Sequence, residues 1–254
     1  MEKREPLMTE EYFDEDIAFT QSAIEKREQN LKNNPDEYTQ IHLVYSTLFT
    51  YSYELLISKY SRGYNIESLR NDFTKVVSYW ENYLNDSKHE EFLLEHSLED
   101  FELALWLFSL AVLLKIDDKV IERLLKCINN NGKDDLFTQL ISSYKKEKIE
   151  KAHLLVFPRV YESLYNSTTI TAEAASQGIK SFLKDWYNYM QPCYWYENHT
   201  GKDGGGFFGY WCWEAALVTY LYDVDDSKYR DMPYYPKDIV DFARNKKILN
   251  EKQL

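Results

Sequence analysis

The chain has 254 residues, of which 44% are hydrophobic and 16% aromatic, enough to bury a core in one large domain or two small ones. Its net charge of −12 argues against nucleic acid or an anionic membrane surface as a partner, because both attract basic patches. The acidity lies in residues 1–100, which hold 21 acids and 10 bases, a net charge of −11. With three cysteines and a polar N-terminus, the sequence predicts a cytoplasmic protein without a disulfide framework.

Hydrophobic residues recur at helical spacing along almost the whole chain. Pro35 and the acids after it favour a helix start, and Gly63 favours a helix end. We predict helices at residues 14–30, 35–62, 66–84, 97–115, 117–129, 134–144, 148–165 (with a break near Pro158), 171–189 and 206–223, and a short one from about Pro236. The sequence has no strand-like alternation of useful length, so we predict an all-α fold, a multi-helix bundle.

Two parts of the sequence resemble each other. Trp80 and Trp186 each begin a Trp-x-Asn-Tyr sequence at the end of an amphipathic helix. A polar connection and an apolar helix follow each of them, and that helix ends in a pair of acids, first at Asp117 and then at Asp225. We therefore predict two related helical halves packed together, residues 1–146 and residues 147–254. Chance similarity between amphipathic helices is the alternative explanation.

The glycines at 204, 206 and 209 match the dinucleotide-binding pattern G-x-G-x-x-G. In nucleotide-binding enzymes a β-strand delivers these glycines to a helix N-terminus, but no strand rich in Val or Ile precedes them here. We predict that this loop binds no nucleotide and instead allows a close helix entry for bulky aromatic residues. The histidines and cysteines show no metal-binding or nucleophile spacing either, so we predict no cofactor, metal or catalytic residue.

Glu214 lies within an otherwise apolar segment. An unpaired buried carboxylate would be costly, so we expect a partner for it in the C-terminal tail, either Arg230 or a tyrosine such as Tyr234 or Tyr235. A catalytic pocket around Glu214 and the glycine loop is the alternative. A second polar feature is the run of acids from Glu81 to Glu102, which is consistent with a solvated face or with an electrostatic docking surface.

Three segments near the C-terminus occur in a distinctive order: Gly209-Tyr-Trp-Cys-Trp-Glu-Ala-Ala216, Asp225-Asp-Ser-Lys-Tyr-Arg-Asp231 and Tyr234-Tyr-Pro-Lys-Asp-Ile-Val-Asp-Phe-Ala-Arg244. They resemble the signature of the PoNi family, bacterial immunity proteins that neutralise PoNe-type DNase toxins of interbacterial competition. The resemblance implies an all-helical, non-enzymatic protein whose partner is the toxin. It also implies mainly structural roles for the signature residues Gly209, Trp211, Glu214, Asp225, Asp226, Arg230, Tyr235 and Pro236. A helical adaptor or regulatory scaffold for another protein is the alternative function.

A DNase must present a basic surface to DNA, so an acidic protein can occupy that surface in place of DNA. On this basis we expect an acidic toxin-binding face. Its predicted residues are Glu90, Glu91, Glu95, Glu99 and Asp100, helped by Asp14, Glu15 and Asp16.

Overall fold

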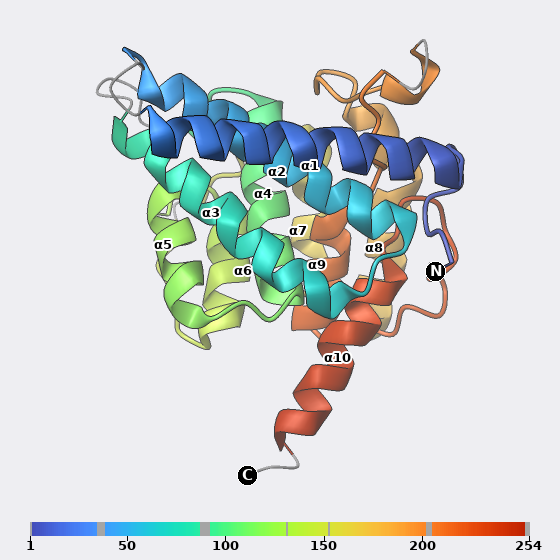
Figure 1. The fold of residues 1–254 in the computed structure, drawn as a ribbon. Coiled ribbons are helices and arrows are strands. Elements are labelled where there is room, and N and C mark those ends of the chain that lie inside the picture. Colours follow the sequence, from blue (N-terminus) through green and yellow to red (C-terminus); the bar gives the residue numbers. More distant parts are fainter. Residues whose placement is uncertain are drawn as a thin grey trace. The chain divides into compact units, whose positions relative to one another are not determined.

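The computed structural model describes residues 2–34, 39–86, 92–130, 132–151, 153–201 and 205–251. All regular secondary structure within these ranges is helical, which confirms the predicted all-α class (Figure 1). The chain forms two compact units, each built from three separate stretches. Unit 1 comprises residues 1–92, 117–127 and 197–210, and unit 2 comprises residues 93–116, 128–196 and 211–254. No helix in the described ranges is long and apolar enough to cross a membrane.

Unit 1 is built on three helices that follow one another in the sequence, α1 (Glu10–Asn33), α2 (Ile41–Arg62) and α3 (Leu69–Asp86), with η2 (Ile66–Ser68) before α3. α2 lies against both α1 and α3 (Figure 1). The core of unit 1 contains a stacked aromatic pair, the rings of Phe49 and Trp80, whose centroids are 5.7 Å apart. α2 ends at Gly63, whose φ of 103° is favourable only for glycine. Most of α5 (Asp118–Ile128) and all of η3 (Asn198–Thr200) also belong to this unit.

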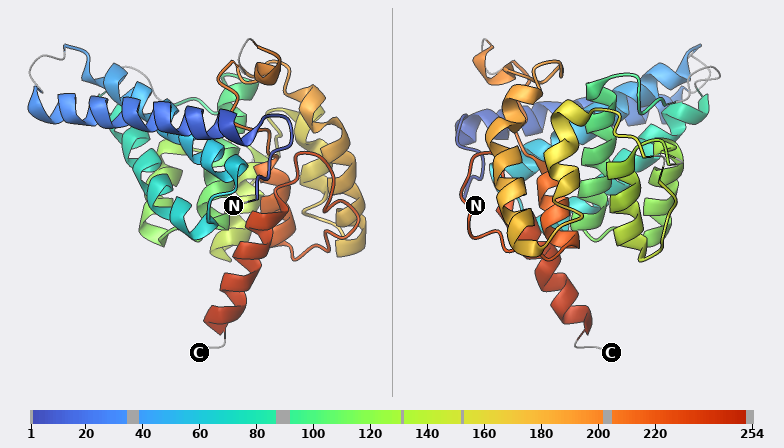
Figure 2. Two further views of the ribbon diagram at one scale, coloured as in Figure 1. Left: turned by 45° about the vertical axis from the view of Figure 1, so that its right-hand side comes forward. Right: turned by 180° about the vertical axis from the view of Figure 1, so that it is seen from behind.

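Unit 2 contains α4 (Leu98–Leu113), α6 (Asp135–Lys145), α7 (Pro158–Asn166), α8 (Ala172–Tyr189), α9 (Trp213–Leu221) and α10 (Lys237–Glu251). Twelve of the sixteen residues of α4 are buried, so this helix has no polar face, as its sequence predicts. α9 packs against α4, and α10 packs against both. The C-terminal end of α10 extends away from these neighbours (Figure 2).

Several predicted helix boundaries are wrong within the described residues, among them those of α1, which runs from Glu10 to Asn33 and not from residue 14 to residue 30. Residues before Pro158 are not helical, because Pro158 is the first residue of α7, where its missing N–H is tolerated. α9 begins at Trp213 and not at Gly206, since Gly206 and Gly209 have left-handed φ values of 80° and 112°. The last helix is longer than expected, with 15 residues. The predicted helix start at Pro35 lies outside the described residues.

The glycine segment forms a strap on unit 1 instead of a helix. The Phe207 carbonyl accepts a hydrogen bond from the Tyr12 hydroxyl (2.8 Å), and the Phe208 carbonyl accepts one from the Ser61 hydroxyl (2.7 Å). The Phe207 ring is buried 6.1 Å from the ring of Phe13 on α1. These contacts satisfy backbone carbonyls that a helix would have paired internally.

The two tryptophans of the sequence repeat have different neighbours. Trp80 packs on Phe49 and meets Phe92 edge to face at 5.1 Å. Trp186 stacks with two other indoles, at Trp106 and Trp195. The relation between the two halves and their division at residue 146 stay predictions.

Candidate functional site

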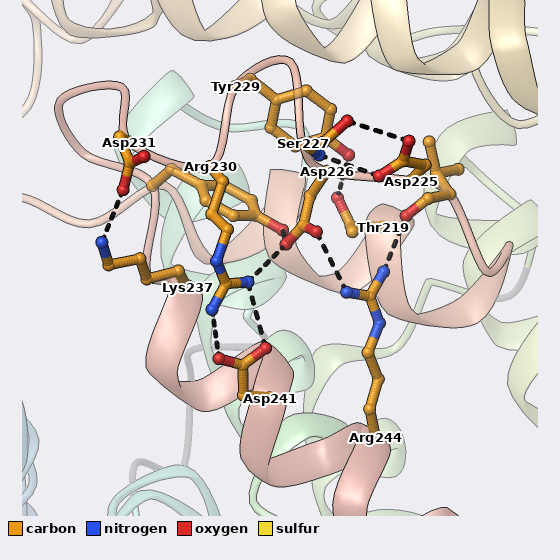
Figure 3. A network of polar contacts seen from close by, with 12 residues as sticks. Thr219, Asp225, Asp226, Ser227, Tyr229, Arg230, Asp231, Lys237, Asp241 and Arg244 are labelled. Carbon is orange, nitrogen blue, oxygen red and sulfur yellow. Dashed lines mark hydrogen bonds and ion pairs between the residues drawn. The ribbon is translucent and has the colours of Figure 1, made fainter.

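Asp226 is the centre of a polar network in unit 2 (Figure 3). Its carboxylate Oδ2 accepts hydrogen bonds from Arg230 Nη1 (3.1 Å) and from the Tyr235 hydroxyl (3.1 Å). Its other oxygen, Oδ1, accepts one from Arg244 Nη1 (3.2 Å). The Asp226 side chain is only 8% exposed, so its charge depends on these donors in place of water.

The two arginines connect this carboxylate to α10. Arg230 pairs with Asp241 through both terminal nitrogens, with Nη1 at 3.0 Å from Oδ1. This contact and the nearby Asp226 raise the pKa of Arg230 above its ordinary value. Arg244 also donates to the Val224 carbonyl (2.7 Å). The segment 224–230 is thereby held to one face of α10 (Figure 3).

The hydroxyl groups of Thr219 and Tyr229 form a hydrogen-bond chain between α9 and this network. Thr219 donates to the Ala215 carbonyl within α9 (2.8 Å), so the Tyr229 hydroxyl donates to Thr219 at 2.8 Å. Burial raises the pKa of Tyr229 to about 12, which keeps this hydroxyl protonated as a donor. The rings of Tyr229 and Tyr235 meet edge to face at 5.0 Å.

The remaining signature residues occupy a turn, two buried positions before helices and the glycine segment. Asp225 accepts hydrogen bonds from the backbone N–H and the hydroxyl of Ser227 (3.0 and 2.9 Å), which forms a local turn. Pro236 is buried immediately before α10, and Trp211 is buried before α9. Gly209 belongs to the glycine strap of unit 1. The structural roles of these residues stay a prediction.

Glu214 is fully buried on α9, as expected, but its expected partner is wrong. Its Oε1 accepts a hydrogen bond from the indole N–H of Trp186 (2.7 Å). Arg230 and Tyr235 cannot serve this carboxyl, because both bind Asp226. The network of the tail is therefore separate from the one around Glu214.

A second buried carboxyl group accompanies Glu214. Glu102 lies on α4, which packs against α9, and is 2% exposed. Burial and the Glu214 carboxylate raise the pKa of Glu102 well above its ordinary value, with partial relief from the Trp195 side chain. Burial also raises the pKa of Glu214, to about 7. A substrate cannot reach either side chain, which disfavours the catalytic alternative.

Three indoles enclose this carboxyl pair. The rings of Trp106, Trp186 and Trp195 stack on one another with centroids 5.4 to 6.3 Å apart. Such aromatic contacts contribute beyond the area that they bury. Glu102 was counted with the acidic run in the sequence, yet it lies in a helix that is apolar all round. The argument that predicted burial for Glu214 applies equally to it.

The eight predicted toxin-binding acids fall into three groups. Glu90 and Glu91 lie outside the described residues. In unit 1, Asp14 pairs with Arg62 (2.8 Å), and the half-buried Asp16 accepts a hydrogen bond from Ser58 (2.8 Å). Glu15 is exposed and makes no hydrogen bond or ion pair within the described part of the chain.

The three predicted acids of unit 2 all have local partners. Glu95 lies 3.4 Å from the Lys133 ammonium group. Glu99 accepts a hydrogen bond from the Tyr194 backbone N–H (3.2 Å). Asp100 belongs to the N-terminal cap of α4, where it accepts a hydrogen bond from the cap serine (2.7 Å). Their role in toxin binding stays a prediction.

We still expect that the glycine loop binds no nucleotide, and this expectation can be tested. Gly205 and Gly206 both have left-handed φ values, and the residues from Phe207 to Cys212 are not helical, so no helix N-terminus points its amides at a phosphate here. Calorimetric titration of the protein with NAD or ATP should give no heat of binding. Micromolar affinity for either nucleotide would contradict this interpretation.

Comparisons with known proteins give a consistent assignment. The N-terminal model of the PoNe immunity proteins (PoNi) matches residues 4–126, and the C-terminal model matches residues 132–239. No curated protein matches the chain. The crystal structure of protein PA2201 from Pseudomonas aeruginosa shares the fold, with a TM-score of 0.72 and 16% identity over 96% of this chain and 92% of that one. Since the two family models cover most of its length, the chain belongs to the PoNi family of PoNe immunity proteins.

Proposed function

We propose that this protein protects its host by binding a PoNe-type DNase toxin and blocking access of DNA to it. The observation that carries the proposal is the match of both family models, in order, along the chain. The burial of Glu102 and Glu214 supports binding in preference to catalysis, because it removes the best-placed acid pair from any substrate.

An acidic surface is the proposed means of inhibition. A nuclease gains much of its affinity for DNA from basic side chains that contact phosphates. Residues 1–100 of this chain carry 21 acids against 10 bases. This region can therefore bind the basic surface of the nuclease in place of DNA. The Asp226 network supports the scaffold in this account, since its central carboxylate is too buried to meet a toxin.

Co-expression with a candidate PoNe-type DNase from the same bacterium tests the proposal in cells. Bacteria that produce the DNase should survive when they also produce this chain, and the two proteins should co-purify. An unrelated DNase of similar activity serves as the control and should not be neutralised. Death of the co-expressing cells despite normal levels of the folded chain would favour the adaptor alternative.

Reversal of the acidic run should slow association with the toxin. In the variant Glu90→Lys, Glu91→Lys, Glu95→Lys, the association rate constant should fall about tenfold or more at low salt, because opposed fields no longer steer the encounter. The difference should shrink as salt rises. Surface plasmon resonance at several ionic strengths measures both effects.

A charge-matched control separates this surface from net charge. Glu147, Glu162 and Glu173 are exposed and lie outside the predicted acidic face. Their triple change to lysine alters the net charge by the same amount and should leave most of the association rate intact. Equal rates for the acidic-run variant and wild type at every salt concentration would show that this run is only a solvated surface.

A further inference from the structure

Some acidic side chains of α1 form ion pairs within the protein, and others do not. Arg62 binds Glu10 (2.9 Å) and Asp14 (2.8 Å). Glu11 and Glu15 are exposed, and neither makes a hydrogen bond or ion pair with any described residue. These two carboxylates therefore keep their charge free for a partner.

The available acids share one side of α1 with an exposed aromatic ring. Phe19 is 73% exposed, more than any other large hydrophobic side chain that the structure describes as exposed. It follows Glu15 by four residues and Glu11 by eight, so the three lie on one stripe of the helix. The buried residues Phe13 and Ile17 belong to the inward stripe that holds α1 to unit 1.

A groove continues this outward side at the other end of α1. It has a volume of about 470 Å³ and lies between α1 and the start of α2, with Lys26, Arg27 and Leu43 in its lining. Leu43 is 52% exposed. Lys26 follows Phe19 by seven residues and so lies on the same stripe. Leu43 lies on α2 beside the basic residues Lys26 and Arg27, so the groove does not suit a basic partner, and the surface that does is the part of α1 around Phe19.

We propose that this side of α1, formed by Glu11, Glu15 and Phe19, is the docking surface for the basic DNA-binding face of the toxin. Phe19 is its apolar anchor, and the two glutamates attract the basic face around it. Exposed aromatic residues that become buried at the centre of a contact carry a large share of binding energy. The inference rests on the proposed function and adds residues of α1 to the surface that binds the toxin.

Charge favours a nuclease over a second copy of this chain as the occupant. Two copies would bring together N-terminal regions that each carry a net charge of −11 over residues 1–100, and they would repel. A DNA-binding face is attracted by the same field. Glu11 and Glu15 form no ion pair with a basic residue in the described ranges, so they strengthen the preference for a basic partner.

Binding of the isolated toxin nuclease domain, made catalytically inactive, tests the inference by calorimetry. Phe19→Ala should raise the Kd at least about 30-fold, as expected for removal of an anchor side chain. Glu11→Lys with Glu15→Lys should raise the Kd at low salt, and the difference from wild type should shrink as the salt concentration rises. Ile170→Ala removes a similarly exposed aliphatic side chain from unit 2 (49% exposed) and should leave the Kd unchanged. Because Phe19 contributes little to the core, the melting temperature of Phe19→Ala should equal that of wild type.

The outcomes distinguish this inference from the proposed function. If wild type binds and inhibits the nuclease while Phe19→Ala binds it within threefold of wild type, the docking surface lies elsewhere and the immunity role stands. If wild type neither binds nor inhibits the nuclease, the proposed function fails and the docking surface with it. If sedimentation shows that Phe19→Ala dissociates a dimer without changing the Kd for the nuclease, a second copy occupies the surface and the inference is wrong.

Discussion

Asp226→Ala is expected to lower the free energy of unfolding by about 3 kcal/mol, the lower end of the range for breaking a buried ion pair. The change removes the acceptor shared by Arg230, Tyr235 and Arg244. The loss stays at the lower end because the two arginines are 31% and 27% exposed, and each keeps another acceptor. Release of the segment from α10 should be the structural result.

Thermal denaturation checks this expectation with a matched control. A loss of about 3 kcal/mol corresponds to a fall in melting temperature of roughly 6–12 °C for a chain of this size. Asp231→Ala breaks the exposed pair with Lys237, in which the aspartate is 83% exposed, and should leave the melting temperature close to that of wild type. Equal melting temperatures for Asp226→Ala and Asp231→Ala would contradict the central role of Asp226.

Glu214→Gln is expected to stabilise the protein at pH 8 by about 3 kcal/mol relative to wild type and to have little effect near pH 4.5. Burial raises the pKa of Glu214 from 4.5 to about 7. Between these values the unfolded chain releases the proton while the folded chain keeps it, so the stability of wild type falls as pH rises. Glutamine cannot ionise, and it retains an oxygen to accept the Trp186 N–H.

The comparison between variant and wild type isolates this carboxyl from other titrating groups. Melting temperatures of both proteins should be measured from pH 4.5 to pH 8, and their difference should grow with pH. Loss of the Glu214 charge also lowers the pKa of Glu102, which acts in the same direction. A difference that stays constant across this range would mean that Glu214 is already ionised in the folded protein.

The helical class and most helix positions follow from the sequence because apolar spacing and end signals agree there. Gly63 and Ser97 mark helix ends or starts in the structure as local chemistry predicts. The predicted helix start at Gly206 is wrong because the spacing of apolar residues does not show which groups will form hydrogen bonds with the backbone carbonyls. The hydroxyls of Tyr12 and Ser61, which lie 195 and 147 residues away in the sequence, donate the hydrogen bonds that hold this strap in place.

The site was predicted less completely than the fold. Burial of Glu214 follows from its apolar neighbours in the sequence, but its partner could not be chosen, because Trp186 reaches it only through the packing of two helices. Asp241 and Arg244 were not singled out, although they lie three residues apart on the last helix and so share one face. The availability of an acid depends on its neighbours in space, which is why Asp14 and Glu15 look alike in the sequence and differ in the structure.

Titration of the purified toxin nuclease with this protein, followed by cleavage of linear DNA, tests the claim of immunity by binding most directly. The account predicts that nuclease activity falls in proportion to the amount of this protein added and is lost at stoichiometric amounts, while an unrelated DNase keeps its activity. Undiminished cleavage by the cognate nuclease in the presence of a large excess of the folded protein would contradict it.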